Sequence, residues 1–122
     1  MNPYEPNITI AIHPPDEEKN YQIVELSGDM DKQGLAKIKP QLEQLSENFS
    51  YQYLVFDLSH LNFINSESIG FLMALYSHLV KMKKIFVITD AKEHVKDVLS
   101  VIGILGIIQY YDSIETFKKQ IA

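Results

Sequence analysis

Cysteine and tryptophan are both absent from the 122-residue sequence. The lack of cysteine excludes disulfide bonds, cysteine-ligated zinc fingers and thiol nucleophiles. No apolar run approaches the roughly 18 residues that a membrane-spanning helix needs. The first ten residues also lack the basic start and apolar stretch of a signal peptide. These absences predict a small soluble protein of the cytoplasm, and the length favours a single compact domain.

Positive charge is scarce as well. There are 11 Lys and Arg residues against 16 Asp and Glu residues, which gives a formal net charge of -5. Nucleic-acid binding depends on concentrated Lys and Arg side chains that neutralise phosphates, so no nucleic-acid partner is expected. Hydrophobic residues make up 46% of the chain and charged residues 22%, the composition of an ordinary globular domain rather than a disordered one.

The spacing of apolar residues predicts the element order β-β-α-β-α-β-α-β-α. Strands are expected at residues 8–12, 21–27, 53–58, 85–88 and 107–110, and helices at about 35–49, 66–84, 90–102 and 113–120. Buried strands separated by helices predict right-handed crossovers, and the first two strands form an antiparallel pair. We therefore predict an α/β domain over residues 8–121, with a mixed, mostly parallel sheet of about five strands and about four helices. Residues 1–7, which contain Pro3 and Pro6, are predicted to be a tail.

Several short segments carry more specific local predictions. Residues 28–31 are expected to form a turn and residues 59–65 a loop. Pro40 lies within the first helical pattern, which predicts a kink or a helix that begins near Pro40. Asp90 and Asp112 each precede a glutamate by three residues, the pattern of a capping box at the start of a helix.

The side chains that could carry chemistry are scattered. The histidines at positions 13, 60, 78 and 94 are not at the spacing of metal ligands, so ordinary surface histidines are expected. Asp29 and Asp31 are expected to cap the next helix rather than to act as paired catalytic carboxylates. The sequence has no glycine-rich phosphate loop and no G-x-S-x-G motif. It therefore predicts no enzyme: no catalytic residue, no metal and no cofactor.

Asp57 is expected to end a buried strand, where α/β proteins often place functional groups. A response-regulator receiver would combine such an aspartate with an acidic pair after the first strand and a lysine after the last. The corresponding segments here are His13-Pro14-Pro15 and Asp112-Ser113, so a receiver is not predicted.

The segment from Asp57 to Gly70 joins that strand to an amphipathic helix. Asn65 and Ser66 are good N-cap residues, and Ser66 is expected in or beside the first exposed turn of the helix. The N–H groups and the positive dipole end at this place suit an anion, and a phosphate on Ser66 would add about -1.5 to -2 charges. From the residues alone, a plain capping role is the simpler explanation of both side chains.

Three groups of residues follow one another in this segment: Asp57-Leu58-Ser59, Phe63-Ile64 and Asn65-Ser66-Glu67-Ser68-Ile69-Gly70. Together they resemble the signature of the STAS domain, the module of bacterial anti-sigma-factor antagonists and of sulphate-transporter tails. That signature is an Asp-x-Ser turn after a strand, an aromatic–aliphatic pair, and Asp-Ser-Ser/Thr-Gly-Leu-Gly at the start of a helix. The segments Leu26–Asp31 and Val98–Ile104 are similar to two further family segments, so the resemblance covers nearly the whole chain.

The resemblance implies a function. In family members that are switched by phosphorylation, the modified Ser or Thr directly follows the motif's Asp, and the matching position is Ser66. The chain departs from the motif at Asn65, Glu67 and Ser68, which stand where the family has Asp, Ser/Thr and Gly. A regulatory protein is implied, which binds an anti-sigma factor with a serine-kinase fold and is released when Ser66 is phosphorylated. The implied contact surface consists of Gly28, Asp29, Asp31, Asn65, Ser66, Glu67 and Ser68.

The sequence leaves other functions open. The altered motif also fits a STAS module that is never phosphorylated and serves as a scaffold or as the partner of a transport ATPase. A small enzyme or nucleotide-binding protein could use the loop as an anion site, although no general base is placed near Ser66. A weak homodimer is open too: strand 8–12 is expected at a sheet edge, and the apolar run 101–108, expected in the core, would support a dimer if partly exposed.

Overall fold

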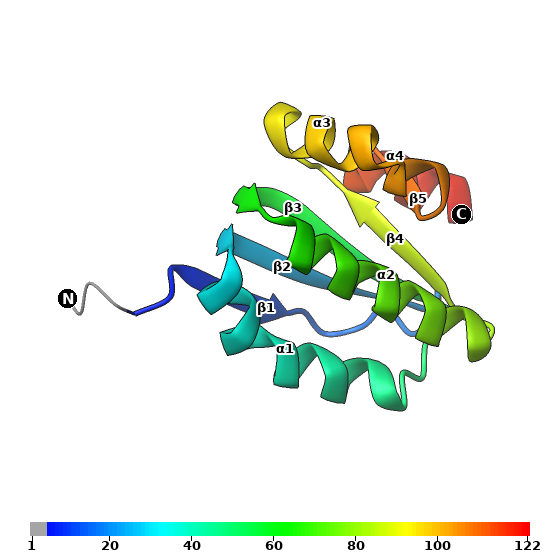
Figure 1. The fold of residues 1–122 in the computed structure, drawn as a ribbon. Helices are drawn as coiled ribbons and strands as arrows, with labels where there is room; N and C mark the ends of the chain where they lie inside the picture. The colour runs from blue at the N-terminus through cyan, green and yellow to red at the C-terminus, as the bar shows by residue number, and fades with distance from the viewer. Residues whose placement is uncertain (1–4) are drawn as a thin grey trace.

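The computed structural model describes residues 5–122, in which five strands form one sheet in the order β1-β2-β3-β4-β5 (Figure 1). The strands are β1 (Ile8–Ile12), β2 (Tyr21–Met30), β3 (Tyr53–Ile64), β4 (Ile85–Thr89) and β5 (Gln109–Tyr111). β1 is antiparallel to β2, and the other neighbours are parallel. The predicted mixed sheet and element order are confirmed. Of the predicted tail, residues 1–4 lie outside the described residues, while the carbonyl of Asn7 accepts a hydrogen bond from the N–H of Asp29.

The helices cover the two faces of the sheet unequally. They are α1 (Lys32–Glu47), α2 (Ser66–Lys81), α3 (Glu93–Ile102) and α4 (Ile114–Ile121), with a short 3-10 helix, η1 (Ile104–Gly106), after α3. Three of them, α1, α2 and α3, pack on one face and form the large core with alternate strand residues such as Phe56 and Ile88. The intervening strand residues, such as Val55 and Val87, face the other side of the sheet, where they pack against Phe117 of α4. Figure 1 shows α4 behind the sheet and α1 and α2 in front of it.

The central strands are longer than the sequence predicted. The expected turn at residues 28–31 and the expected loop at 59–65 are largely strand, because β2 runs to Met30 and β3 to Ile64. Parallel pairing continues through two register shifts up to the pair Met30–Ile64. Polar residues in these stretches hid the pattern, although Leu61 and Ile64 are buried as strand residues facing the large core.

Helix starts account for the other differences. α1 begins at Lys32 and passes through Pro40 without a break, so a helix beginning near Pro40 was wrong. The Pro40 side chain is exposed, which lets water satisfy the carbonyl that loses its donor. The predicted caps Asp90 and Asp112 were each wrong: the N-cap residues of α3 and α4 are Lys92 and Ser113.

Within residues 5–122, none of the helices combines the length and the apolar character that crossing a bilayer would demand.

Gly28 supplies a test of this architecture. Its φ is 109°, and a Cβ added there would overlap the carbonyl oxygen of Asn7, because β1 approaches β2 closely. Gly28→Ala is therefore expected to lower the free energy of unfolding by at least about 2 kcal/mol in urea denaturation. Gly70→Ala is the control, since its Cβ would meet open space on α2, and it should raise that free energy by about 0.5–1 kcal/mol. Equal effects of the two substitutions would contradict the close approach.

Candidate functional site

Two helices begin side by side at the carboxyl ends of the central strands. Met30 and Ile64 are the last paired residues of β2 and β3, and each is followed by the N-cap residue of a helix. Asp31 Oδ1 accepts from the N–H of Gly34 at 2.8 Å, and Asn65 Oδ1 accepts from the N–H of Ser68 at 2.8 Å. The predicted caps at Asp31 and Asn65 are thus observed, and they place the positive dipole ends of α1 and α2 next to each other.

The carbonyl of Met30 ties the start of α2 to β2. It accepts hydrogen bonds from the N–H of Asn65 at 3.1 Å and from the hydroxyl of Ser68 at 2.8 Å. Ser68 is completely buried, so its side chain holds the helix in place and presents nothing to a partner. A buried hydrogen bond of this kind between two elements is costly to lose, since an unpaired acceptor would stay enclosed.

Ser66 and Glu67 lie at the surface in the first turn of α2, and both side chains are exposed. Asp29, Asp31 and Asn65 are half-buried beside them, whereas Gly28 is buried under β1. Of the residues singled out from the sequence, five therefore reach the surface at one edge of the sheet. Three of those five are carboxylates, so this set of residues carries a net negative charge.

Three further side chains near this edge were not assigned to the contact surface from the sequence: Phe63, Lys92 and His94. Phe63, the penultimate residue of β3, is 49% exposed, an unusual position for a large aromatic ring. Lys92 donates to Asn62 Oδ1, and His94 Nε2 lies 2.7 Å from the carbonyl oxygen of Asn62. These contacts fix the start of α3 against the end of β3. The Phe63-Ile64 pair was noted in the sequence as part of the motif, whereas the contacts of Asn62 could not be, because they join residues about 30 positions apart.

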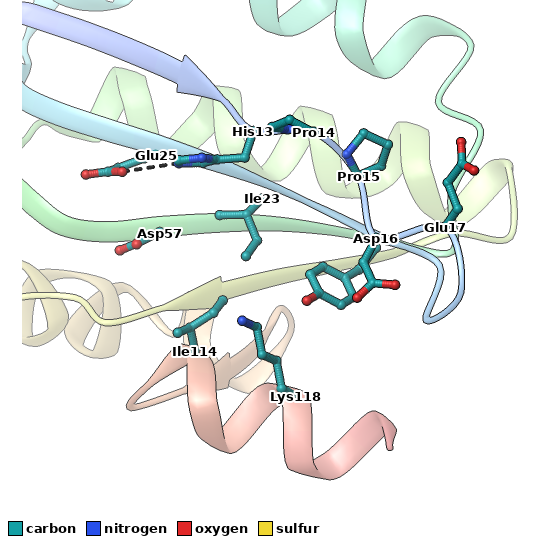
Figure 2. Close-up of a pocket in the computed structure, with 11 residues that line it drawn as sticks. His13, Pro14, Pro15, Asp16, Glu17, Ile23, Glu25, Asp57, Ile114 and Lys118 are labelled. Atoms are coloured by element: carbon teal, nitrogen blue, oxygen red, sulfur yellow. Dashed lines mark hydrogen bonds and ion pairs between the residues drawn. The ribbon is translucent and has the colours of Figure 1, made fainter.

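A second feature is an open groove of about 760 Å³ on the sheet face that α4 leaves uncovered (Figure 2). The carboxylate of Glu25 on β2 lies 3.3 Å from His13 Nε2 and 3.3 Å from His60 Nδ1. Asp57 and Lys118 line the same groove as Glu25. Asp57 lies in the middle of β3, not at its end as predicted, and its Oδ1 accepts from the N–H of Ser59. The alternation of polar and apolar residues along β2 and β3 was the sequence signal that could have predicted this polar groove. In residues 5–122 no three His, Asp or Glu side chains are arranged to hold a metal ion.

Two enclosed polar side chains follow one another at the end of β4, next to this groove. Thr89 Oγ1 and Asp90 Oδ2 are enclosed and have no hydrogen-bond partner among the described residues. Burial raises the pKa of the Asp90 carboxyl, the neighbouring Thr89 side chain partly opposes this, and the charge of Asp57 raises it further. Asp90 also has a positive φ of 59°, which few residues other than Gly, Asn and Asp adopt.

The comparisons with known proteins place this geometry in a family. The family model of the STAS domain matches residues 14–117. The chain belongs to the STAS domain family. Among solved structures, it is similar to an anti-sigma factor antagonist from Mycobacterium paratuberculosis, with 20% identity, a TM-score of 0.81 and 93% of each chain covered. It is also similar to a STAS domain protein from Planctomyces limnophilus described as an anti-sigma-factor antagonist, with 14% identity, a TM-score of 0.78 and 93% and 97% covered.

A third similar structure is the Bacillus cell fate determinant SpoIIAA in its phosphorylated form, with 11% identity, a TM-score of 0.68, and coverage of 92% of this chain and 99% of that one. At these identities the similarity shows the fold, which is the one the resemblance in the sequence implied. This STAS domain therefore resembles anti-sigma factor antagonists over nearly its whole length.

The cap of α2 can be tested directly. Asn65→Ala removes the acceptor for the N–H of Ser68, and it should lower the free energy of unfolding by about 1 kcal/mol. Asn65→Asp keeps an acceptor and adds a negative charge at the helix N-terminus, so its stability should stay within about 0.5 kcal/mol of the parent chain. Chemical denaturation of the three proteins provides the measurement. An alanine variant as stable as the parent would show that the cap carries no stability.

Asp90 predicts a pH dependence of stability. Its pKa is raised in the folded state, so the folded protein binds this proton more tightly than the unfolded chain does. The contribution is present in full below the ordinary aspartate pKa and is lost as the pH rises through the raised value. Asp90→Asn should therefore gain stability relative to the parent as the pH rises from about 3 to about 7. Denaturant titrations across this range measure the difference; a constant difference would contradict the raised pKa.

Proposed function

We propose that this STAS domain is an anti-sigma factor antagonist whose binding is switched by phosphorylation of Ser66. Its partner would be an anti-sigma factor with a serine-kinase fold, in the cytoplasm of a bacterium, and the protein itself would act by being bound rather than as an enzyme. The observation that supports the proposal is the position of Ser66: an exposed hydroxyl in the first turn of α2, on a helix start held by Asn65 and Ser68.

A rigid site suits a switch that works by charge. The start of α2 is fixed to β2 through Met30 and capped by Asn65, so a phosphate on Ser66 need not refold the helix. The N-terminal dipole of α2 would stabilise the phosphate within the free protein. The added charge and bulk would instead act on a partner that packs against the same surface, where a desolvated phosphate needs a matching cation.

The contact surface that we propose consists of the exposed or half-buried residues Asp29, Asp31, Asn65, Ser66 and Glu67. Gly28 and Ser68 shape this surface from within, because both are buried. Glu67 contributes a negative charge in both states of Ser66. A phosphate on Ser66 would therefore add to the negative charges of Asp29, Asp31 and Glu67, and this crowded charge would have to be desolvated where a partner packs against the surface.

The test uses the serine-kinase-fold anti-sigma factors encoded in the same genome, incubated with this protein and ATP. Phosphosite mapping by mass spectrometry should find Ser66, and Ser66→Ala should abolish the modification. Ser66→Asp should weaken binding to the unmodified partner by about tenfold or more, since it brings a charge to a packed surface. Ser77→Asp is the matched control, because Ser77 is also exposed on α2 but lies three turns away.

Two outcomes would overturn the proposal. Modification at other residues with Ser66 untouched, together with unchanged binding by Ser66→Asp, would leave no switch at this site. Binding to a transport ATPase or a scaffold complex without any effect of Ser66 variants would favour the unswitched STAS module instead.

A further inference from the structure

A stripe of apolar side chains lies uncovered on α3. Val98, Val101 and Ile102 follow a spacing of three and four, so they share one side of the helix. Val101 is 86% exposed and Ile102 is 53% exposed. The core side of α3 is instead formed by Val95 and Leu99, which are buried. The sequence placed this run in the core; in the structure only Ile104 and Ile108 of residues 101–108 are buried.

The stripe extends beyond α3. The 3-10 helix η1 continues from it and leads to Ile107, which is 51% exposed. Ile107 lines a shallow groove with Val80, the exposed residue near the end of α2, and with Lys84. We name the set Val80, Val98, Val101, Ile102 and Ile107 the α3 patch. A single exposed apolar residue is ordinary, but a neighbouring group of this kind marks an interaction surface.

The charges at its two ends indicate what covers the α3 patch. Asp97 lies one turn before Val101 on the exposed side of α3, and it takes part in none of the ion pairs of the described residues. Lys84 lies at the opposite end, where the groove contains Val80 and Ile107. In an antiparallel contact about a twofold axis, the N-terminal half of one α3 helix lies over the C-terminal end of the other. Each Asp97 would then approach the Lys84 of the second copy. The patch is therefore complementary to itself in charge as well as in apolar character.

We propose that the α3 patch is a homodimer interface, in which two copies of this chain pack their α3 helices antiparallel about a twofold axis. Homodimer interfaces are more apolar than other protein interfaces, which fits five exposed aliphatic side chains with Asp97 and Lys84 beside them. The net charge of -5 on each copy opposes association, so the dimer is expected to dissociate at low concentration.

The dimer would leave the Ser66 surface free. Ser66 begins α2, whereas Val80 is next to its last residue, and a helix of this length separates them by about 21 Å. A dimer that packs over the Val80 end of the patch would therefore leave the Ser66 surface of both copies accessible. It does not depend on the phosphorylation of Ser66, and either proposal can fail without the other.

Sedimentation equilibrium of the full chain, from about 1 µM to about 1 mM, tests the dimer. The apparent mass should rise with concentration from one chain to two. Val101→Asp should raise the dissociation constant by about tenfold or more, because it buries an unpaired charge at the centre of the patch. Val101 is almost fully exposed in the single chain, so the thermal midpoint of the dissociated variant should stay that of the parent monomer.

Ile12→Asp is the matched control. Ile12 is 45% exposed on β1, the edge strand at the far side of the sheet from α3, and its substitution should leave the dissociation constant unchanged. If Ile12→Asp separates the copies and Val101→Asp does not, the association uses the edge strand and the proposal is wrong. A mass of one chain throughout the concentration range would overturn it as well.

Charge exchange tests the twofold arrangement. Asp97→Lys and Lys84→Asp should each weaken the dimer by about threefold to tenfold, and the double variant should restore most of the loss because both new charges meet across the axis. Failure of the double variant to recover, with dissociation by Val101→Asp retained, would overturn the antiparallel arrangement.

Discussion

The parallel pairing of β2 with β3 determines the rest of this structure, and its last hydrogen-bond acceptor matters most. The carbonyl of Met30, at the end of β2, accepts from both the backbone of Asn65 and the hydroxyl of Ser68. Because the parallel strands β2 and β3 end at the same edge of the sheet, the helices that follow them, α1 and α2, begin side by side at that edge. The exposed hydroxyl of Ser66 therefore lies on the first turn of α2, which the carbonyl of Met30 holds against β2.

The unequal covering of the sheet explains where the remaining surfaces lie. Three helices on one face build the large core, while α4 alone covers part of the other. The uncovered part carries Glu25, His13 and Asp57 in an open groove. On the covered face, α3 is buried along one side only, which leaves the α3 patch. The Ser66 surface lies at the start of α2, whereas the α3 patch includes Val80 near the end of α2, so the two proposed kinds of association would use different parts of one small domain.

Particular residues show why some predictions held and others did not. Asn65 and Asp31 were recognisable as caps because capping depends on a side chain and the backbone three residues later. Asp90 and Asp112 match the same local pattern, yet tertiary contacts decided otherwise: the N–H of Asp90 pairs with the carbonyl of Tyr111, and Asp112 pairs with Lys96. The length of β3 was missed because its second half is strand only through its pairing with β2.

The sequence by itself determined the α/β class, the order of the elements and the candidate switch residue, because apolar periodicity, helix caps and the STAS-like motif are all local in the chain. Only the tertiary structure decided which of these residues reach solvent. Ser66 and Ser68 stand two positions apart in one motif, but the helix turns the first outward and the second toward Met30. Likewise Ile102 and Ile104 belong to one apolar run, and only packing against the sheet separates the exposed side chain from the buried one. Burial depends on contacts between residues distant in sequence, and these form only when the sheet and its helices are assembled.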